Sequence, residues 1–269
     1  MNQYIYTDLT LEVADSIGLM NNRIYLEQTD VYKSKIEITQ DELANQLGKP
    51  KGTYLTLEAN SKESNLSKEL SNCLVELLPK TCKTILVAGL GNENATPDAL
   101  GPKVVSKLTI TRKIYGKDQG VLAIEPGVLA QTGMETIEIL KGIIKEVKPD
   151  VLVVVDALAA RSISRIGRTI QLTDTGIEPG SGVGNYQKAL TKKTLNLPVI
   201  AIGVPTVIGA GTLVCDIMEQ ICGESMDQLD ELIPTFYVTP KDVDEMVDTL
   251  SATIASSLNK TFKKLIPLE

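Results

Sequence analysis

Three short, mainly aliphatic runs constrain the fold of this chain more than any other feature. They are Thr84–Ala88, Val151–Val155 and Pro198–Ile202, and segments with helical patterns lie between them. A continuous apolar run of this length is typical of a strand that is buried on both faces. Such strands, alternating with helices, favour a mostly parallel, twisted sheet covered by helices on both sides. We therefore predict an α/β fold with three layers.

The helical segments are recognised by their spacing of apolar residues. In Ser61–Lys80 the leucines recur at intervals of three and four residues, and Ala99–Leu108 shows a similar pattern. Glu135–Val147 is amphipathic and is closed by Pro149, which cannot continue a helix. We expect these segments to pack against the predicted sheet.

The first part of the chain differs from the rest. Residues 1–60 are polar, with short strand-like pieces at 35–38 and 53–57. We expect an N-terminal segment over residues 1–60, a small irregular extension that contains strands and a short propeptide. Residues 61–269 are expected to form the α/β domain, with the two parts integrated into one unit.

Composition excludes several classes of function. The 269 residues carry a net charge of −7, which argues against direct nucleic-acid binding because phosphate contacts need clustered Lys and Arg. Residues 1–10 lack the basic and apolar stretches of a secretory signal. The uncharged run Leu195–Cys215 is interrupted by prolines and glycines, so we interpret it as a buried strand followed by a helix. A soluble cytoplasmic protein without a membrane segment is expected.

The chain contains no histidine, which limits its chemistry further. A Ser-His-Asp triad, a Cys-His dyad and an H-E-x-x-H zinc site are all excluded. The four cysteines show no C-x-x-C spacing, so we expect neither a metal nor another cofactor. Acid–base chemistry is left to carboxylates, lysines, tyrosines or cysteines.

Two aspartates occupy the positions where a parallel sheet places its chemistry. Asp156 comes directly after one aliphatic run, and Asp98 lies in the loop that follows Ala88. Ligands of open α/β sheets bind beyond the carboxyl ends of the strands, so both side chains are expected at that edge. Two simpler interpretations remain open: Asp98 as a helix N-cap, and Asp156 as the partner of Arg161 or Arg165 in an ion pair.

Two glycine-rich segments are candidate ligand contacts. The turn Gly89-Leu90-Gly91-Asn92 suggests a dinucleotide site, but Asn94 stands where the third glycine of that motif belongs, so nucleotide binding is only an alternative. In the second segment Gly182, Gly184 and Asn185 could face a substrate, or could belong to an ordinary surface loop.

These segments together resemble the germination proteases of spore-forming bacteria, a family of atypical aspartic peptidases. The resemblance is dense over residues 84–210 and thinner at both ends. The motifs that carry it include Val87-Ala88-Gly89-Leu90-Gly91-Asn92, Thr96-Pro97-Asp98-Ala99, Asp156-Ala157-Leu158-Ala159-Ala160-Arg161, Asp174-Thr175-Gly176-Ile177 and Pro198–Val207.

The resemblance implies a fold related to that of hydrogenase maturation peptidases, with Asp98 and Asp156 as the catalytic pair. It implies that the substrates are small acid-soluble spore proteins, cut in the spore core at the start of germination. It also implies a homotetramer. Arg161 is a candidate partner for acidic substrate residues, although an ion pair that orients Asp156 is the simpler role. A metal-dependent maturation peptidase of the same fold is an alternative function.

The family is made as a zymogen that cuts off its own N-terminal segment. Its cut sites have an acidic residue before the bond and an apolar residue after it, and Asp8-Leu9 has this form. We expect autoprocessing between these two residues. The chain departs from the family in having Gly209 where Asp is usual, and in a shorter connection from there to Val238. These departures concern oligomer contacts and zymogen control.

Overall fold

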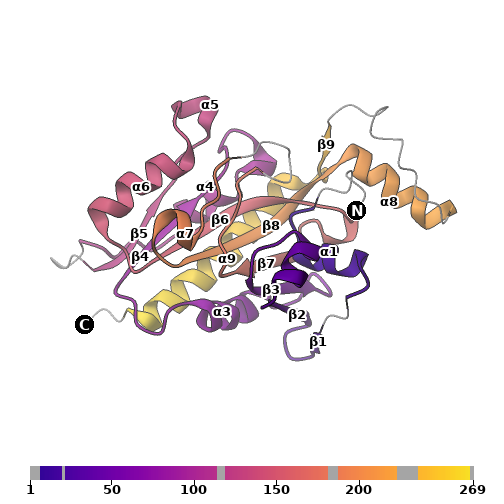
Figure 1. Ribbon diagram of the computed structural model, residues 1–269, viewed down its shortest axis with the longest axis horizontal. Coiled ribbons are helices and arrows are strands. Elements are labelled where there is room, and N and C mark those ends of the chain that lie inside the picture. The colour runs from indigo at the N-terminus through magenta and orange to yellow at the C-terminus, as the bar shows by residue number, and fades with distance from the viewer. Residues whose placement is uncertain (1–6, 20–21, 114–118, 181–186, 223–235, 267–269) are drawn as a thin grey trace.

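The computed structural model describes residues 7–19, 22–113, 119–180, 187–222 and 236–266. In these residues nine strands form a single sheet of order β1-β2-β3-β7-β8-β6-β4-β5, with β9 paired to β8 (Figure 1). The strands are β1 (Asn22–Leu26), β2 (Val31–Ile38), β3 (Gly52–Ala59), β4 (Thr84–Gly89), β5 (Gly120–Ile124), β6 (Val151–Ala160), β7 (Thr169–Thr173), β8 (Val199–Gly209) and β9 (Tyr237–Val238).

The helices lie on both faces of this sheet. They are α1 (Thr10–Ser16), α2 (Asp41–Leu47), α3 (Leu66–Leu77), α4 (Leu100–Ser106), α5 (Leu129–Thr132), α6 (Thr136–Val147), α7 (Lys192–Leu195), α8 (Ala210–Cys222) and α9 (Val243–Leu265). None of the described helices is both long and apolar enough to cross a membrane. The helices predicted from leucine spacing are confirmed as α3, α4 and α6.

The sheet has a parallel half and an antiparallel half. Strands β5, β4, β6 and β8 are mutually parallel, and the three aliphatic runs of the sequence form β4, β6 and β8. From β8 through β7, β3 and β2 to β1 the pairing is antiparallel. The predicted α/β fold is therefore confirmed, with antiparallel strands that extend the parallel centre into a mixed sheet.

Burial on both faces explains why the central strands are continuously apolar. Successive side chains of a strand point to opposite faces, so each face needs its own apolar cover. Val153 and Val155 pack toward α3, α4 and α9, whereas Leu152 and Val154 pack toward α6 and α7. The helices on the two sides of the sheet can be followed in Figure 1.

The N-terminal part is more ordered than its sequence suggested. Strand β3 pairs with β7, so residues 22–59 continue the same sheet instead of forming an irregular extension. Leu11, Ile38 and Leu47 belong to a small apolar cluster that joins α1 and α2 to these strands. The sheet runs across the boundary predicted at residue 60, and that boundary remains a prediction.

Two strands are longer than their apolar runs, and both extensions lie near the site described below. Strand β6 continues to Ala160, so Asp156 lies within it, and the expectation that this residue follows its strand is wrong. Strand β8 continues through Pro205, where its register with β6 shifts so that Leu158 pairs with Pro205 and Ala159 with Val207. The residue left out of the ladder is Thr206. Pro205, which lacks a backbone N–H, lies directly beside this bulge, a position where sheets tolerate proline.

Candidate active site

Asp98 is held in a tight loop beyond the end of β4. Its carboxylate accepts a hydrogen bond from the Asn92 backbone N–H (2.8 Å). Gly91 has φ of +110°, and a side chain there would collide with the Asp98 backbone oxygen, so the loop requires glycine. The N-cap of α4 is Ala99, without a side-chain cap, so the interpretation of Asp98 as an N-cap is wrong.

Asp156 is buried inside β6, with 6% of its surface exposed. Its carboxylate accepts a hydrogen bond from the Ala157 backbone N–H (2.9 Å). Burial raises the pKa of Asp156 well above its ordinary value, and the negative charges of Asp98 and Asp8 raise it further. Burial also raises the pKa of Asp98, with the Asn92 hydrogen bond opposing it.

Both aspartates line one cavity of about 300 Å³ at the end of the parallel strands. Other residues around it include Asp8, Pro97, Thr206 and Tyr237. When two carboxylates repel one another in a buried site, both do not ionise readily, so the two groups tend to share one proton. Such a pair supplies a general acid and a general base together.

The segment that contains the expected cut lies at this cavity. The Asp8 backbone N–H donates to the Ala159 carbonyl oxygen (3.0 Å), and the Asp8 carboxylate accepts from the Ala159 N–H (2.9 Å). Leu9 is fully buried in an apolar cluster with Leu158 and Ile208. The acidic residue before the bond therefore shares the cavity of the two aspartates, and the apolar residue after it occupies an apolar environment.

Two polar residues that the sequence analysis missed contact the same segment. The Asp8 carbonyl oxygen accepts hydrogen bonds from Lys49 Nζ (3.2 Å) and Gln171 Nε2 (3.3 Å). Lys49 lies between α2 and β3, where no sequence pattern singled it out. Gln171 is a polar residue in the buried strand β7, which was the only signal available.

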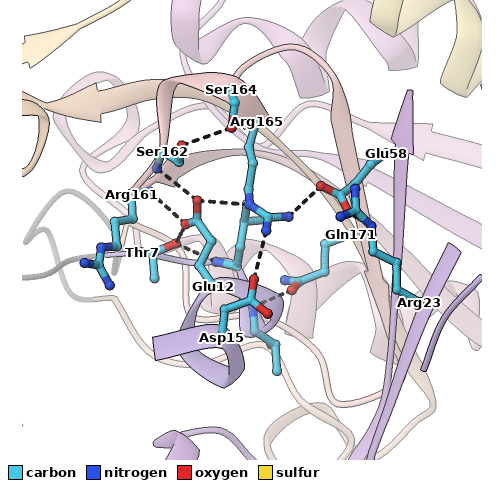
Figure 2. Close-up of polar contacts among 12 residues, drawn as sticks. Thr7, Glu12, Asp15, Arg23, Glu58, Arg161, Ser162, Ser164, Arg165 and Gln171 are labelled. Carbon is cyan, nitrogen blue, oxygen red and sulfur yellow. Dashed lines mark hydrogen bonds and ion pairs between the residues drawn. The ribbon is translucent and has the colours of Figure 1, made fainter. Parts of the chain in front are cut away.

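A second missed feature is a buried carboxylate that anchors α1 beside the end of β6. Glu12 accepts hydrogen bonds from the backbone N–H groups of Arg161 (2.7 Å) and Ser162 (3.0 Å), and from the hydroxyl of Thr7 (Figure 2). Arg165 forms ion pairs with Glu12 (3.5 Å), Asp15 (2.9 Å) and Glu58 (2.7 Å). Burial raises the pKa of Glu12, and the hydrogen bonds and Arg165 oppose that rise.

These contacts bear on the remaining predicted site residues. The guanidinium of Arg161 points away from Glu12 in Figure 2, and the charges that act on Asp156 are those of Asp98 and Asp8. A substrate contact by Arg161 stays a prediction. Gly182, Gly184 and Asn185 lie outside the described residues.

Within the described residues no group of three or more His, Cys, Asp or Glu side chains could hold a metal ion.

Comparison with known proteins agrees with a peptidase. A family model described as germination protease matches residues 15–234, which places the chain among the proteases. The germination protease of Clostridium perfringens (strain ATCC 13124) is 35% identical over 98% of this chain and 97% of its own length. That of Clostridium acetobutylicum is 38% identical over 89% of this chain and 87% of its own length. The chain belongs to the germination protease family.

Two further similarities were found. A Geobacillus germination protease is 46% identical over 70% of this chain and 55% of its own length. Among solved structures, a NiFe hydrogenase maturation protease from Thermococcus kodakarensis covers 71% of this chain and 98% of its own, with a TM-score of 0.40 and 21% identity.

Proposed function

We propose that this chain is an aspartic-type endopeptidase that cleaves small acid-soluble spore proteins in the spore core when germination begins. The observation that supports it most is that Asp98 and Asp156 line one cavity and that the charge of Asp98 raises the pKa of Asp156. Family membership supports the spore setting, and the carboxylate pair supports the catalytic type.

The pKa shifts suggest a role for each member of the pair. Asp156 is the more deeply buried, so it holds the shared proton, and Asp98 is the ionised member. Asp98 takes a proton from a water molecule, whose oxygen bonds to the scissile carbonyl carbon. When the C–N bond breaks, Asp156 gives its proton to the leaving amine nitrogen. One proton remains on the pair, now on Asp98.

Cleavage of a purified small acid-soluble spore protein tests the substrate class. We expect the full chain to cut it after an acidic residue that precedes an apolar one, and mass spectrometry of the fragments would locate each cut. A metal-dependent peptidase would lose this activity in a chelator, whereas a carboxylate pair keeps it. Absence of any cut, or cuts without an acidic residue on the amino side, would contradict the proposal.

The same pair is proposed to cut the chain itself between Asp8 and Leu9. The contacts of Asp8 with Ala159 and its place in the cavity support this step. After mild acid treatment, N-terminal sequencing should find a new start at Leu9. Replacing Asp8 by Lys is expected to stop the cut, because the carboxylate that binds the Ala159 N–H is lost. Persistence of Met1 in the wild-type chain would argue against autoprocessing.

An exposed apolar surface supports the further proposal of a homo-oligomer, a tetramer by family resemblance. Ile217 (41% exposed) and Ile221 (75%) on α8 and Phe236 (63%) beside β9 are large apolar side chains that are exposed to solvent. Helix α8 lies at one end of the molecule, next to β9 (Figure 1). Exposed apolar groups of this kind mark interaction surfaces. A monomeric mass in light scattering would refute this assembly.

A further inference from the structure

The carbonyl oxygen of Asp8 is the atom that would carry negative charge if the Asp8–Leu9 bond were attacked. Lys49 Nζ lies 3.2 Å from it and Gln171 Nε2 lies 3.3 Å from it. Both distances are at or beyond the long end of an ordinary hydrogen bond. Catalytic hydrogen bonds are often long in the ground state and shorten when charge develops on the acceptor.

The direction of the Gln171 amide is fixed by its other contact. Gln171 Oε1 accepts a hydrogen bond from the Thr10 backbone N–H (2.7 Å), so its Nε2 has to face the Asp8 carbonyl oxygen. Strand β7, which carries Gln171, is paired with β3 on one side and with β8 on the other. The side chain of Gln171 therefore hydrogen-bonds the backbone on both sides of the Asp8–Leu9 bond, and the strand that carries it is held in the sheet on both edges.

Lys49 supplies a positive charge in the same place. Burial lowers the pKa of Lys49, and the carboxylates of Asp8 and Glu178 oppose this effect. The mildly acid conditions proposed for processing favour the ammonium form of this side chain. Lys49 is half-buried, and a charge that is partly removed from water stabilises a developing negative charge more strongly than the same charge in bulk solvent.

We propose that Lys49 and Gln171 form the oxyanion hole of this protease, an inference that rests on the proposed function. As the water oxygen bonds to the Asp8 carbonyl carbon, the π electron pair moves onto the carbonyl oxygen, and both side chains donate hydrogen bonds to it. When the C–N bond breaks, the electron pair on the oxygen returns to form the C=O double bond again. In a spore-protein substrate, the same donors would hold the carbonyl of the acidic residue before the cut.

The test measures the first-order rate of the Asp8–Leu9 cut in the full-length chain after mild acid treatment, by intact-mass spectrometry. Replacing one oxyanion donor typically lowers the rate by roughly 10²–10³-fold, and Lys49→Met and Gln171→Ala are each expected to do so. Lys49→Arg keeps a charged donor and should recover part of the rate. Lys51→Met is the matched control, since Lys51 is exposed and pairs with Asp41 (2.7 Å) on the surface.

Hydrogen exchange separates catalysis from simple docking of the segment. If Lys49 and Gln171 act on the oxyanion, the Ala159 amide stays as protected in the variants as in the wild type while cutting slows. Variants that lose this protection in proportion to the rate, or that cut at the wild-type rate, would overturn the proposal. Continued cutting by Asp98→Asn would reject the aspartate pair alone. A wild-type chain that never cuts at Asp8–Leu9 would overturn the oxyanion hole and the autoprocessing step, whereas the aspartate pair is tested separately by cleavage of a spore-protein substrate.

Discussion

Asn in place of Asp98 or of Asp156 is expected to slow cleavage of a spore-protein substrate by roughly 10⁴-fold, because under the proposed mechanism each change removes one partner of the acid–base pair. Asn has nearly the shape of Asp but can neither accept the proton of water nor hold a proton for the leaving amine. Fragment analysis over time gives the rate. Asp41→Asn is the control, since this carboxylate is exposed and pairs only with surface Lys51 in the contacts described.

Circular dichroism and chemical unfolding show whether the fold survives these changes. The raised pKa of Asp156 means that its contribution to stability is full below the pKa of an unfolded carboxyl and is lost as pH rises through the folded pKa. Asp156→Asn should therefore unfold at a higher denaturant concentration than the wild type near neutral pH, with the difference vanishing in acid. Full activity in either natively folded variant would reject the pair.

Replacing Glu12 by Ala is expected to lower the free energy of unfolding by about 2–5 kcal/mol. The change leaves the partly buried backbone N–H groups of Arg161 and Ser162 without their acceptor, and it removes one carboxylate from Arg165. Equilibrium unfolding in urea measures the loss.

The control for Glu12 is another glutamate of the N-terminal region. Glu42 lies in the first turn of α2 with its side chain exposed, so Glu42→Ala should change stability by no more than about 0.5 kcal/mol. A loss of similar size in both variants would mean that the buried contacts of Glu12 contribute little to holding α1 in place.

The centre of the fold was predictable because burial on both faces leaves a strong trace in the sequence. Val151–Val155 has no polar residue, because the side chains of this strand pack against an apolar layer on each face of the sheet. The end of this apolar run also pointed to Asp156 as a site residue, although strand β6 itself continues to Ala160. Its continuation rests on pairing with β8 beyond Gly203, a tertiary effect that local apolarity cannot show.

The N-terminal contributions could not be predicted in the same way. Lys49 meets Asp8 across 41 positions of the sequence, and Glu12 meets Arg161 across 149. Neither residue belongs to a periodic pattern, and each acquires its partner only when β3 pairs with β7 and places the polar N-terminal region against the end of β6. Long-range pairing of this kind is specified by the whole sheet.

The hydrogen bonds between Asp8 and Ala159 join two parts of one polypeptide. A peptide bond that belongs to the same chain as the catalytic groups does not have to meet them by diffusion. Its effective molarity depends on geometry and not on the protein concentration. The proposed removal of the residues before Leu9 would accordingly be a unimolecular event, with the same rate at high and at low protein concentration. Any delay in such a chain must then come from protonation or from motion of the backbone.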